Sequence, residues 1–160
     1  MSSVENKEIA LALYEGFNKH DLDSLVSMCA DDVKYTDMVT GQTFEGPAGF
    51  REATGRWMSA FSDAQLEIVN QVITDDFVFT EFVGRGTHAG TFASPGGPSI
   101  PATGKKGELP CCEAFRLRDG KVVSGRIYYD MLTLLGQLGV APGLPTERPA
   151  ETPAPEPPLP

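Results

Sequence analysis

The dipeptide Asp119-Gly120, between two runs of strand-forming residues, constrains the fold more than any other feature of this sequence. Asp-Gly supplies the positive φ angles of a two-residue type I′ turn, so its flanks are predicted to form a β-hairpin. Counting outward from the turn places Glu113 opposite Arg126. Because side chains alternate along a strand, one face of the hairpin is predicted to carry Glu113, Phe115, Leu117, Val122, Ser124, Arg126, Tyr128 and Asp130.

This predicted face mixes apolar and ionisable side chains, the composition of a reactive cavity wall. Asp130 ends the hairpin, just before a short apolar helix over 131–138 that Gly139 terminates. A carboxylate in an apolar cavity has a raised pKa and can act as base and then as acid, so Asp130 is the first catalytic candidate. Paired with Glu113, Arg126 either faces a developing enolate or a substrate carboxylate, or simply holds the wall together. Tyr128, on the same face, is a candidate substrate contact.

Two alternating segments, 66–72 and 77–85, precede the hairpin and flank a tight turn at Asp75-Asp76. Their alternation predicts that Glu81 lies beside Asn70 on the cavity face. Glu81 is therefore a second catalytic candidate, or a carboxylate hydrogen-bonded to Asn70 or Arg85. His88 is predicted at the pocket mouth as an acid or hydrogen-bond donor, or else as a structural histidine.

The N-terminal part of the chain is predicted to be mainly helical, over 5–19, 22–29 and 47–61, with a strand over 33–37. Asp21 suits an N-cap and Pro47 the first turn of a helix. Tyr14 and Trp57 lie on helix faces that should meet the sheet, as core residues or as a platform for a flat ligand. Asp37, with Tyr35, either faces the cavity or is a turn residue.

Composition limits the classes of function. A chain of 160 residues predicts one domain, here 1–140, and the proline-rich stretch 141–160 predicts a disordered tail. The net charge of −9 argues against a nucleic-acid partner. No apolar run approaches the ~20 residues that span a bilayer, and no signal sequence is evident, so a cytoplasmic protein without membrane contact is predicted. The cysteines and histidines show no metal-ligand spacing, and no metal is expected.

Helices followed by long strands describe an α+β domain in which helices cover one face of a curved sheet and leave a cavity. The motifs of this chain resemble the SnoaL-like polyketide cyclase and ester cyclase branch of the nuclear-transport-factor-2-like superfamily, over residues 5–139. The resemblance rests on Gly86–Phe92, Ala102–Lys105, Phe115–Val122, Asp130 and Leu134–Gly139. It implies a conical barrel whose curved antiparallel sheet wraps around N-terminal helices, a short C-terminal helix, a homodimer, and no cofactor.

The resemblance also implies a function. In the characterised cyclases an aspartate at the end of a late strand is the general acid/base of an intramolecular aldol closure, and Asp130 matches that position. A cofactor-free cyclase or isomerase of a polyketide-like carbonyl compound is therefore the leading hypothesis. The alternatives are a non-catalytic ligand-binding or dimerising module, and an epoxide hydrolase in which two carboxylates flank Arg126.

Overall fold

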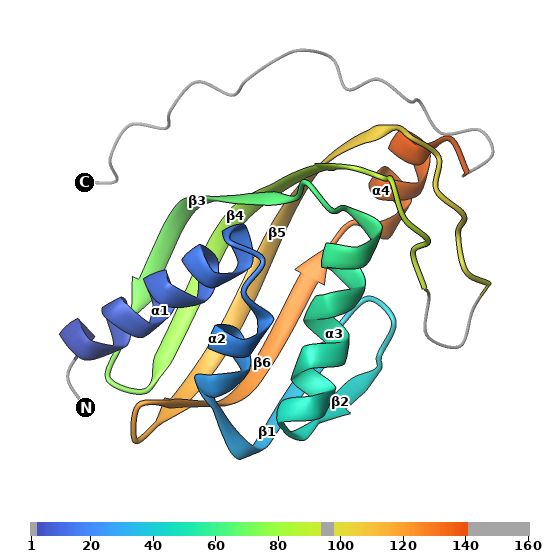
Figure 1. The fold of residues 1–160 in the computed structure, drawn as a ribbon. Coiled ribbons are helices and arrows are strands. Elements are labelled where there is room, and N and C mark those ends of the chain that lie inside the picture. Colours follow the sequence, from blue (N-terminus) through green and yellow to red (C-terminus); the bar gives the residue numbers. More distant parts are fainter. Residues whose placement is uncertain (1–2, 94–97, 141–160) are drawn as a thin grey trace, which may run out of the picture.

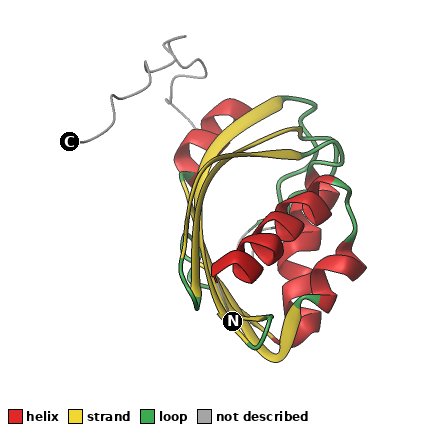
Figure 2. Ribbon diagram, turned by 90° about the vertical axis from the view of Figure 1, so that its left-hand side faces the viewer, coloured by secondary structure: helices red, strands yellow, loops and turns green. Residues whose placement is uncertain are grey.

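The computed structural model describes residues 3–93 and 98–140, and the predicted tail lies outside them. One curved sheet carries helices on its concave side (Figures 1 and 2). In chain order the elements are α1 (Ser3–Asn18), α2 (Leu22–Ser27), β1 (Cys29–Asp37), β2 (Thr43–Glu45), α3 (Gly46–Ala60), β3 (Gln65–Ile73), β4 (Phe77–Thr87), β5 (Lys106–Arg118), β6 (Lys121–Tyr129) and α4 (Met131–Leu138). The α+β prediction is confirmed.

Local signals place most helix ends. Asp21 caps α2, since its side chain accepts a hydrogen bond from the Ser24 amide. Pro47 lies in the first turn of α3, where a backbone N–H would have no partner within the helix, so its absence costs no hydrogen bond. Gly139 ends α4 in the left-handed conformation, with φ of 72°. Cys29 differs from its prediction, because it begins β1 instead of ending α2.

The six-stranded sheet has the order β2-β1-β6-β5-β4-β3, and its neighbouring strands are antiparallel except for the parallel pair β1 and β6. The helices α1, α2 and α3 lie across the concave face (Figure 2). Side chains from both layers are buried between them, among them Val33, Val78 and Val122 from the sheet and Ala10 and Ala53 from the helices. Among the described residues, no helix is both long and apolar enough to cross a membrane.

The hairpin register is correct at the turn and wrong beyond it. Leu117 pairs with Val122 as predicted, but the register then shifts and Glu113 pairs with Ile127 instead of Arg126. The cause is a β-bulge at Val123, an extra residue on β6 that inverts the alternation of the side chains after it. Consequently Gly125 and Ile127 face the concave side, while Arg126 and Tyr128 face outward.

A second bulge lies in β3, between Ile68 and Asn70. Leu66 and Ile68 keep the predicted inward direction, but Asn70 and the residues after it reverse. In β4 the concave side carries Val78, Thr80 and Phe82. Phe77, Phe79, Glu81 and Val83 lie on the convex face instead, so the predicted face of this hairpin is wrong from the bulge onward.

Candidate active site

A cavity lies between the concave face of the sheet and the helices α1, α2 and α3. Its volume is about 110 Å³. Its walls are mostly apolar and strongly aromatic, with contributions from Tyr14, Phe17, Tyr35, Phe50, Trp57 and Phe82. A deep, largely apolar cavity with a few polar groups is the usual form of a small-molecule site.

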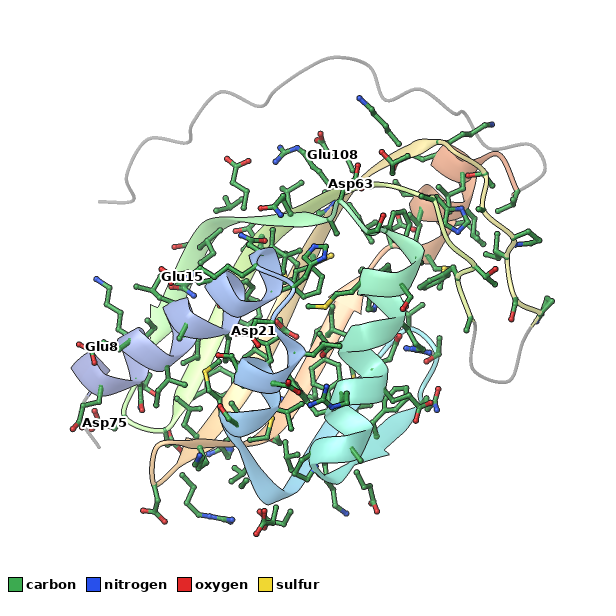
Figure 3. The ribbon with its side chains drawn as sticks, viewed as in Figure 1. Glu8, Glu15, Asp21, Asp63, Asp75 and Glu108 are labelled. Atoms are coloured by element: carbon green, nitrogen blue, oxygen red, sulfur yellow. The ribbon has the colours of Figure 1, made fainter. Side chains whose placement is uncertain are left out.

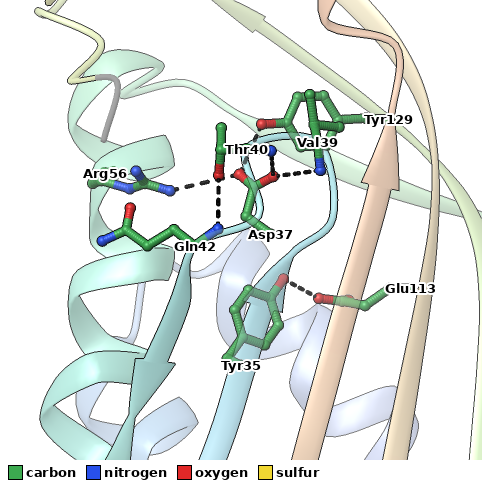
Figure 4. Close-up of polar contacts among 8 residues, drawn as sticks. All are labelled: Tyr35, Asp37, Val39, Thr40, Gln42, Arg56, Glu113 and Tyr129. Atoms are coloured by element: carbon green, nitrogen blue, oxygen red, sulfur yellow. Dashed lines mark hydrogen bonds and ion pairs between the residues drawn. The ribbon is translucent and has the colours of Figure 1, made fainter. Parts of the chain in front are cut away.

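Glu113 is the carboxyl group in this cavity wall, and it is buried. Tyr14 donates a hydrogen bond to its Oε2 at 2.9 Å, and Tyr35 donates to its Oε1 at 2.5 Å (Figure 4). Burial raises the pKa of Glu113 to about 7, although both tyrosine hydrogen bonds favour the carboxylate and oppose that rise. Near neutral pH the group can therefore both take up and release a proton.

Three elements bring these groups together: β5 carries Glu113, α1 carries Tyr14 and β1 carries Tyr35. The Tyr35 ring fits there because its neighbour on β6 is Gly125. A Cβ atom at position 125 would lie 2.5 Å from Tyr35 Cδ2 and 2.8 Å from Phe115 Cε1. Burial together with the charge of Glu113 raises the pKa of both tyrosines well above the usual value, so they remain neutral donors.

Neighbouring rings hold the two tyrosines in place. Tyr35 packs edge-to-face on Phe50, with ring centroids 5.3 Å apart, and Tyr14 packs on Phe82 in the same manner at 5.3 Å. Both phenol groups are thus oriented toward Glu113 before any ligand arrives. Trp57 lines the cavity from α3, 5.2 Å from the ring of Tyr129.

The Asp37 carboxylate faces inward, but its oxygens bond to other groups of the protein (Figure 4). Its Oδ1 accepts hydrogen bonds from the amides of Val39 at 2.9 Å and Thr40 at 3.1 Å. Its Oδ2 accepts one from the Tyr129 hydroxyl at 2.8 Å and lies 3.8 Å from the Arg56 guanidinium. Asp37 therefore fixes the turn between β1 and β2, and it is not among the residues that line the cavity.

Asp130 does not lie where the sequence predicts. It is exposed, and as the N-cap of α4 its carboxylate accepts hydrogen bonds from the Thr133 amide at 3.0 Å and the Thr133 hydroxyl at 2.7 Å. The bulge at Val123 explains the difference, because it reverses the direction of the side chains that follow on β6. The expected cavity position of Asp130 is thus wrong.

Reversals of this kind in β6 and in the β3–β4 hairpin place other predicted site residues on the convex face. Arg126 and Tyr128 lie on the convex face, so the predicted ion pair between Arg126 and Glu113 does not form. Glu81 is also exposed on that face, and it pairs with Asn70 in the predicted register. None of these three side chains lines the cavity.

His88 is fully buried and also lies outside the cavity lining. Its Nδ1 accepts a hydrogen bond from the Thr103 amide at 3.3 Å, which places the ring proton on Nε2. Burial lowers the pKa of His88, so the ring is neutral at neutral pH. The ring packs against Phe61 at 5.2 Å, and its buried Nε2 has no hydrogen-bond partner among the described residues.

The structure therefore brings together four of the predicted residues, Tyr14, Tyr35, Trp57 and Glu113. Sequence reasoning missed Cys111, which lines the same cavity; its position two residues before Glu113 on β5 was the available signal. It also missed Arg56, for which the helical pattern holds no signal. The Arg56 guanidinium lies 4.9 Å from the centre of the Phe44 ring and beside Asp37.

The model of the SnoaL-like polyketide cyclase family matches residues 7–138. This chain belongs to that family. Membership supports an enzyme with a cyclase or isomerase type of role acting on a small molecule. No curated protein matches the sequence.

Solved structures agree with this family and fold. IdmH of Streptomyces antibioticus, a candidate polyketide cyclase, is 29% identical with a TM-score of 0.68, covering 84% of this chain and 98% of its own. AclR of Streptomyces galilaeus, a candidate hydroxylase, is 26% identical with a TM-score of 0.76, covering 90% and 87%. A Catenulispora acidiphila protein with a ketosteroid isomerase-like fold, in complex with trimethylamine, is 21% identical with a TM-score of 0.69, covering 84% and 94%.

Proposed function

We propose that this family member closes a ring in a polyketide-like carbonyl compound and that Glu113 is its general acid and base. The supporting observation is the carboxyl of Glu113, buried in the cavity wall with a pKa of about 7 and held by two tyrosine hydroxyls. A group with this pKa transfers protons efficiently near neutral pH. Asp130, on the surface and bonded to Thr133, is not given this role.

The proposed reaction has two proton transfers and one bond formation. Glu113 as carboxylate removes a proton from a carbon next to a substrate carbonyl, which leaves an enolate. The enolate carbon attacks a second carbonyl carbon of the same molecule, so a carbon–carbon bond forms and an alkoxide results. The protonated Glu113 then returns its proton to that alkoxide. Tyr14 and Tyr35 stabilise the carboxylate form before the reaction and the charged oxygen during it.

The test is proton–deuterium exchange, followed by NMR, at the carbons beside the carbonyl groups of a linear aryl diketone able to close to a six-membered ring. The wild-type protein is expected to accelerate exchange, and Glu113→Gln to slow it by about 100-fold or more. Asp130→Asn, a change of the same kind at an exposed carboxylate, is expected to retain the rate. Loss of exchange in Asp130→Asn with retention in Glu113→Gln would overturn the assignment.

A second reading, a ligand-binding module without catalysis, remains an outcome of the same test. Binding of the diketone by the wild-type protein without accelerated exchange would favour it. Epoxide opening is less favoured, because the two carboxylates proposed to flank Arg126 do not meet: Asp130 and Arg126 lie outside the cavity.

We also propose a homodimer formed through the convex face of the sheet. This face exposes Val72 by 54% and Tyr128 by 42%, and Phe79 pairs with Val72 on the same side. Apolar side chains gathered on one face favour association. A mechanism without cofactor, the lack of a nucleic-acid partner and a cytoplasmic location stay predictions.

A further inference from the structure

Glu113 is a buried acid, and none of the described residues places a positive charge beside it. The titratable groups directed toward it are Tyr14 from α1, Tyr35 from β1 and Cys111 from β5. Burial raises the pKa of Cys111 to about 12, and the two phenols also stay protonated, so all three are neutral at neutral pH. The facing positions on the neighbouring strands are Thr80 and Ile127, which do not titrate.

Arg85 is the one arginine among the described residues that line the cavity, and its charge is already paired. Its Nε donates to Glu108 at 3.0 Å and its Nη1 to Glu67 at 2.5 Å, and 46% of its side chain is exposed. An anionic ligand would therefore meet no available positive charge inside. Many acidic side chains, among them Glu15, Asp63 and Glu108, also lie over the surface (Figure 3).

Aromatic rings line the same cavity as the acid. The Tyr35 ring contacts Phe50 and Phe115, with centroid distances of 5.3 Å and 6.3 Å, and Tyr14 contacts Phe82 at 5.3 Å. The face of an aromatic ring attracts a cation placed within about 6 Å of its centre, and desolvation strengthens this attraction. A carboxylate among such rings is a suitable partner for a positively charged organic group.

We propose that this cavity selects organic ammonium ions, with a tertiary or quaternary ammonium group held against Glu113 and the surrounding aromatic rings. The bound cation supplies the opposite charge that the described residues do not. It also keeps Glu113 ionised, which is the form required of a base. The inference concerns binding alone and stands on the cavity, so it can fail while the proposed chemistry holds, and the reverse.

The test compares choline with its neutral isostere 3,3-dimethylbutan-1-ol and its anionic isostere 3,3-dimethylbutanoate, by NMR titration of the full chain. Above the pKa of Glu113, choline is expected to bind about tenfold more tightly than the alcohol. Choline carries a fixed charge, so its affinity should fall severalfold when the pH is lowered by about two units through that pKa. The affinity of the alcohol should not fall.

Two variants assign the effect. Glu113→Gln keeps the shape of the side chain and is expected to remove most of the preference for choline over the alcohol, leaving the part that the aromatic rings supply. Glu52→Gln, at an exposed position on α3, should leave both affinities unchanged. A choline preference that is undiminished in Glu113→Gln, or tighter binding of the anion than of choline, would overturn the proposal. If Glu113→Gln does not fold, the pH dependence of choline binding to the wild-type protein decides, and a flat dependence overturns it.

Discussion

Glu113 combines a burial that opposes ionisation with two donors that favour it, and burial dominates, since its pKa rises to about 7. In the unfolded chain the same carboxyl titrates near its ordinary value of about 4.3. The folded state therefore binds the proton more strongly, and the stability that Glu113 contributes is present at acidic pH. As the pH rises through about 7 that contribution is lost.

Glu113→Gln should remove this dependence. The free energy of unfolding of the wild-type protein is expected to fall by roughly 3 kcal/mol from this group between about pH 4 and pH 8. Denaturant unfolding across that range, in wild type and Glu113→Gln, measures the difference. Parallel curves would contradict the raised pKa.

Tyr35→Phe tests the opposing hydrogen bond. The Tyr35 hydroxyl stabilises the carboxylate, so its removal should raise the pKa of Glu113 above about 7, by about one pH unit. Carbon-detected NMR titration of the Glu113 carboxyl reports the change. Tyr128→Phe removes a hydroxyl from the convex face and is expected to leave that pKa as it was.

At the scale of elements, β6 determines how the cavity is built. Its bulge directs Gly125 and Ile127 inward, and the missing side chain of Gly125 leaves space for the Tyr35 ring. An added Cβ would overlap Tyr35 and Phe115, so Gly125→Ala is expected to destabilise the protein by about 1–3 kcal/mol. Gly55→Ala is the matched control. Residue 55 lies inside α3, and a Cβ there would be 3.6 Å from the Leu22 side chain, at ordinary contact distance. Alanine in a helix interior should stabilise the protein by about 0.5–1 kcal/mol.

The N-cap of α4 gives a second test at this scale. Asp130→Ala removes the hydrogen bonds to Thr133, and a cap loss of this kind costs about 1 kcal/mol. Binding in the cavity should stay unchanged, because Asp130 does not line it. Thermal unfolding together with a choline titration separates the two effects; a loss of binding without a loss of stability would return Asp130 to the site.

For the whole molecule, the convex face of the sheet is the surface on which the proposed dimer depends. Val72→Glu places a charge among its apolar side chains and is expected to give a monomer, whereas the wild-type protein is expected to have twice the mass of the 17.2 kDa chain. Light scattering after size-exclusion chromatography measures both masses. Val39→Glu, in the turn after β1, serves as the control at another exposed valine.

The sequence by itself determined several helix ends and the tip of the hairpin, because those signals are local. Asp21 as a cap, Pro47 in a first turn, Gly139 at a helix end and Asp119-Gly120 at a hairpin tip each act within a few residues. It also indicated the α+β class, since helical and alternating patterns occupy separate parts of the chain.

Only the tertiary structure decided which side chains enter the cavity. One extra residue at Val123 and another near Val69 invert the alternation of two strands, and neither bulge has a local signal that counting could use. For this reason Asp130, Arg126 and Glu81 were predicted inside and lie outside. Glu113 lies on β5, which precedes the bulged strand β6 in the chain, so its inward direction is as predicted. Its hydrogen-bond partners are tyrosines from α1 and β1, far away in the chain.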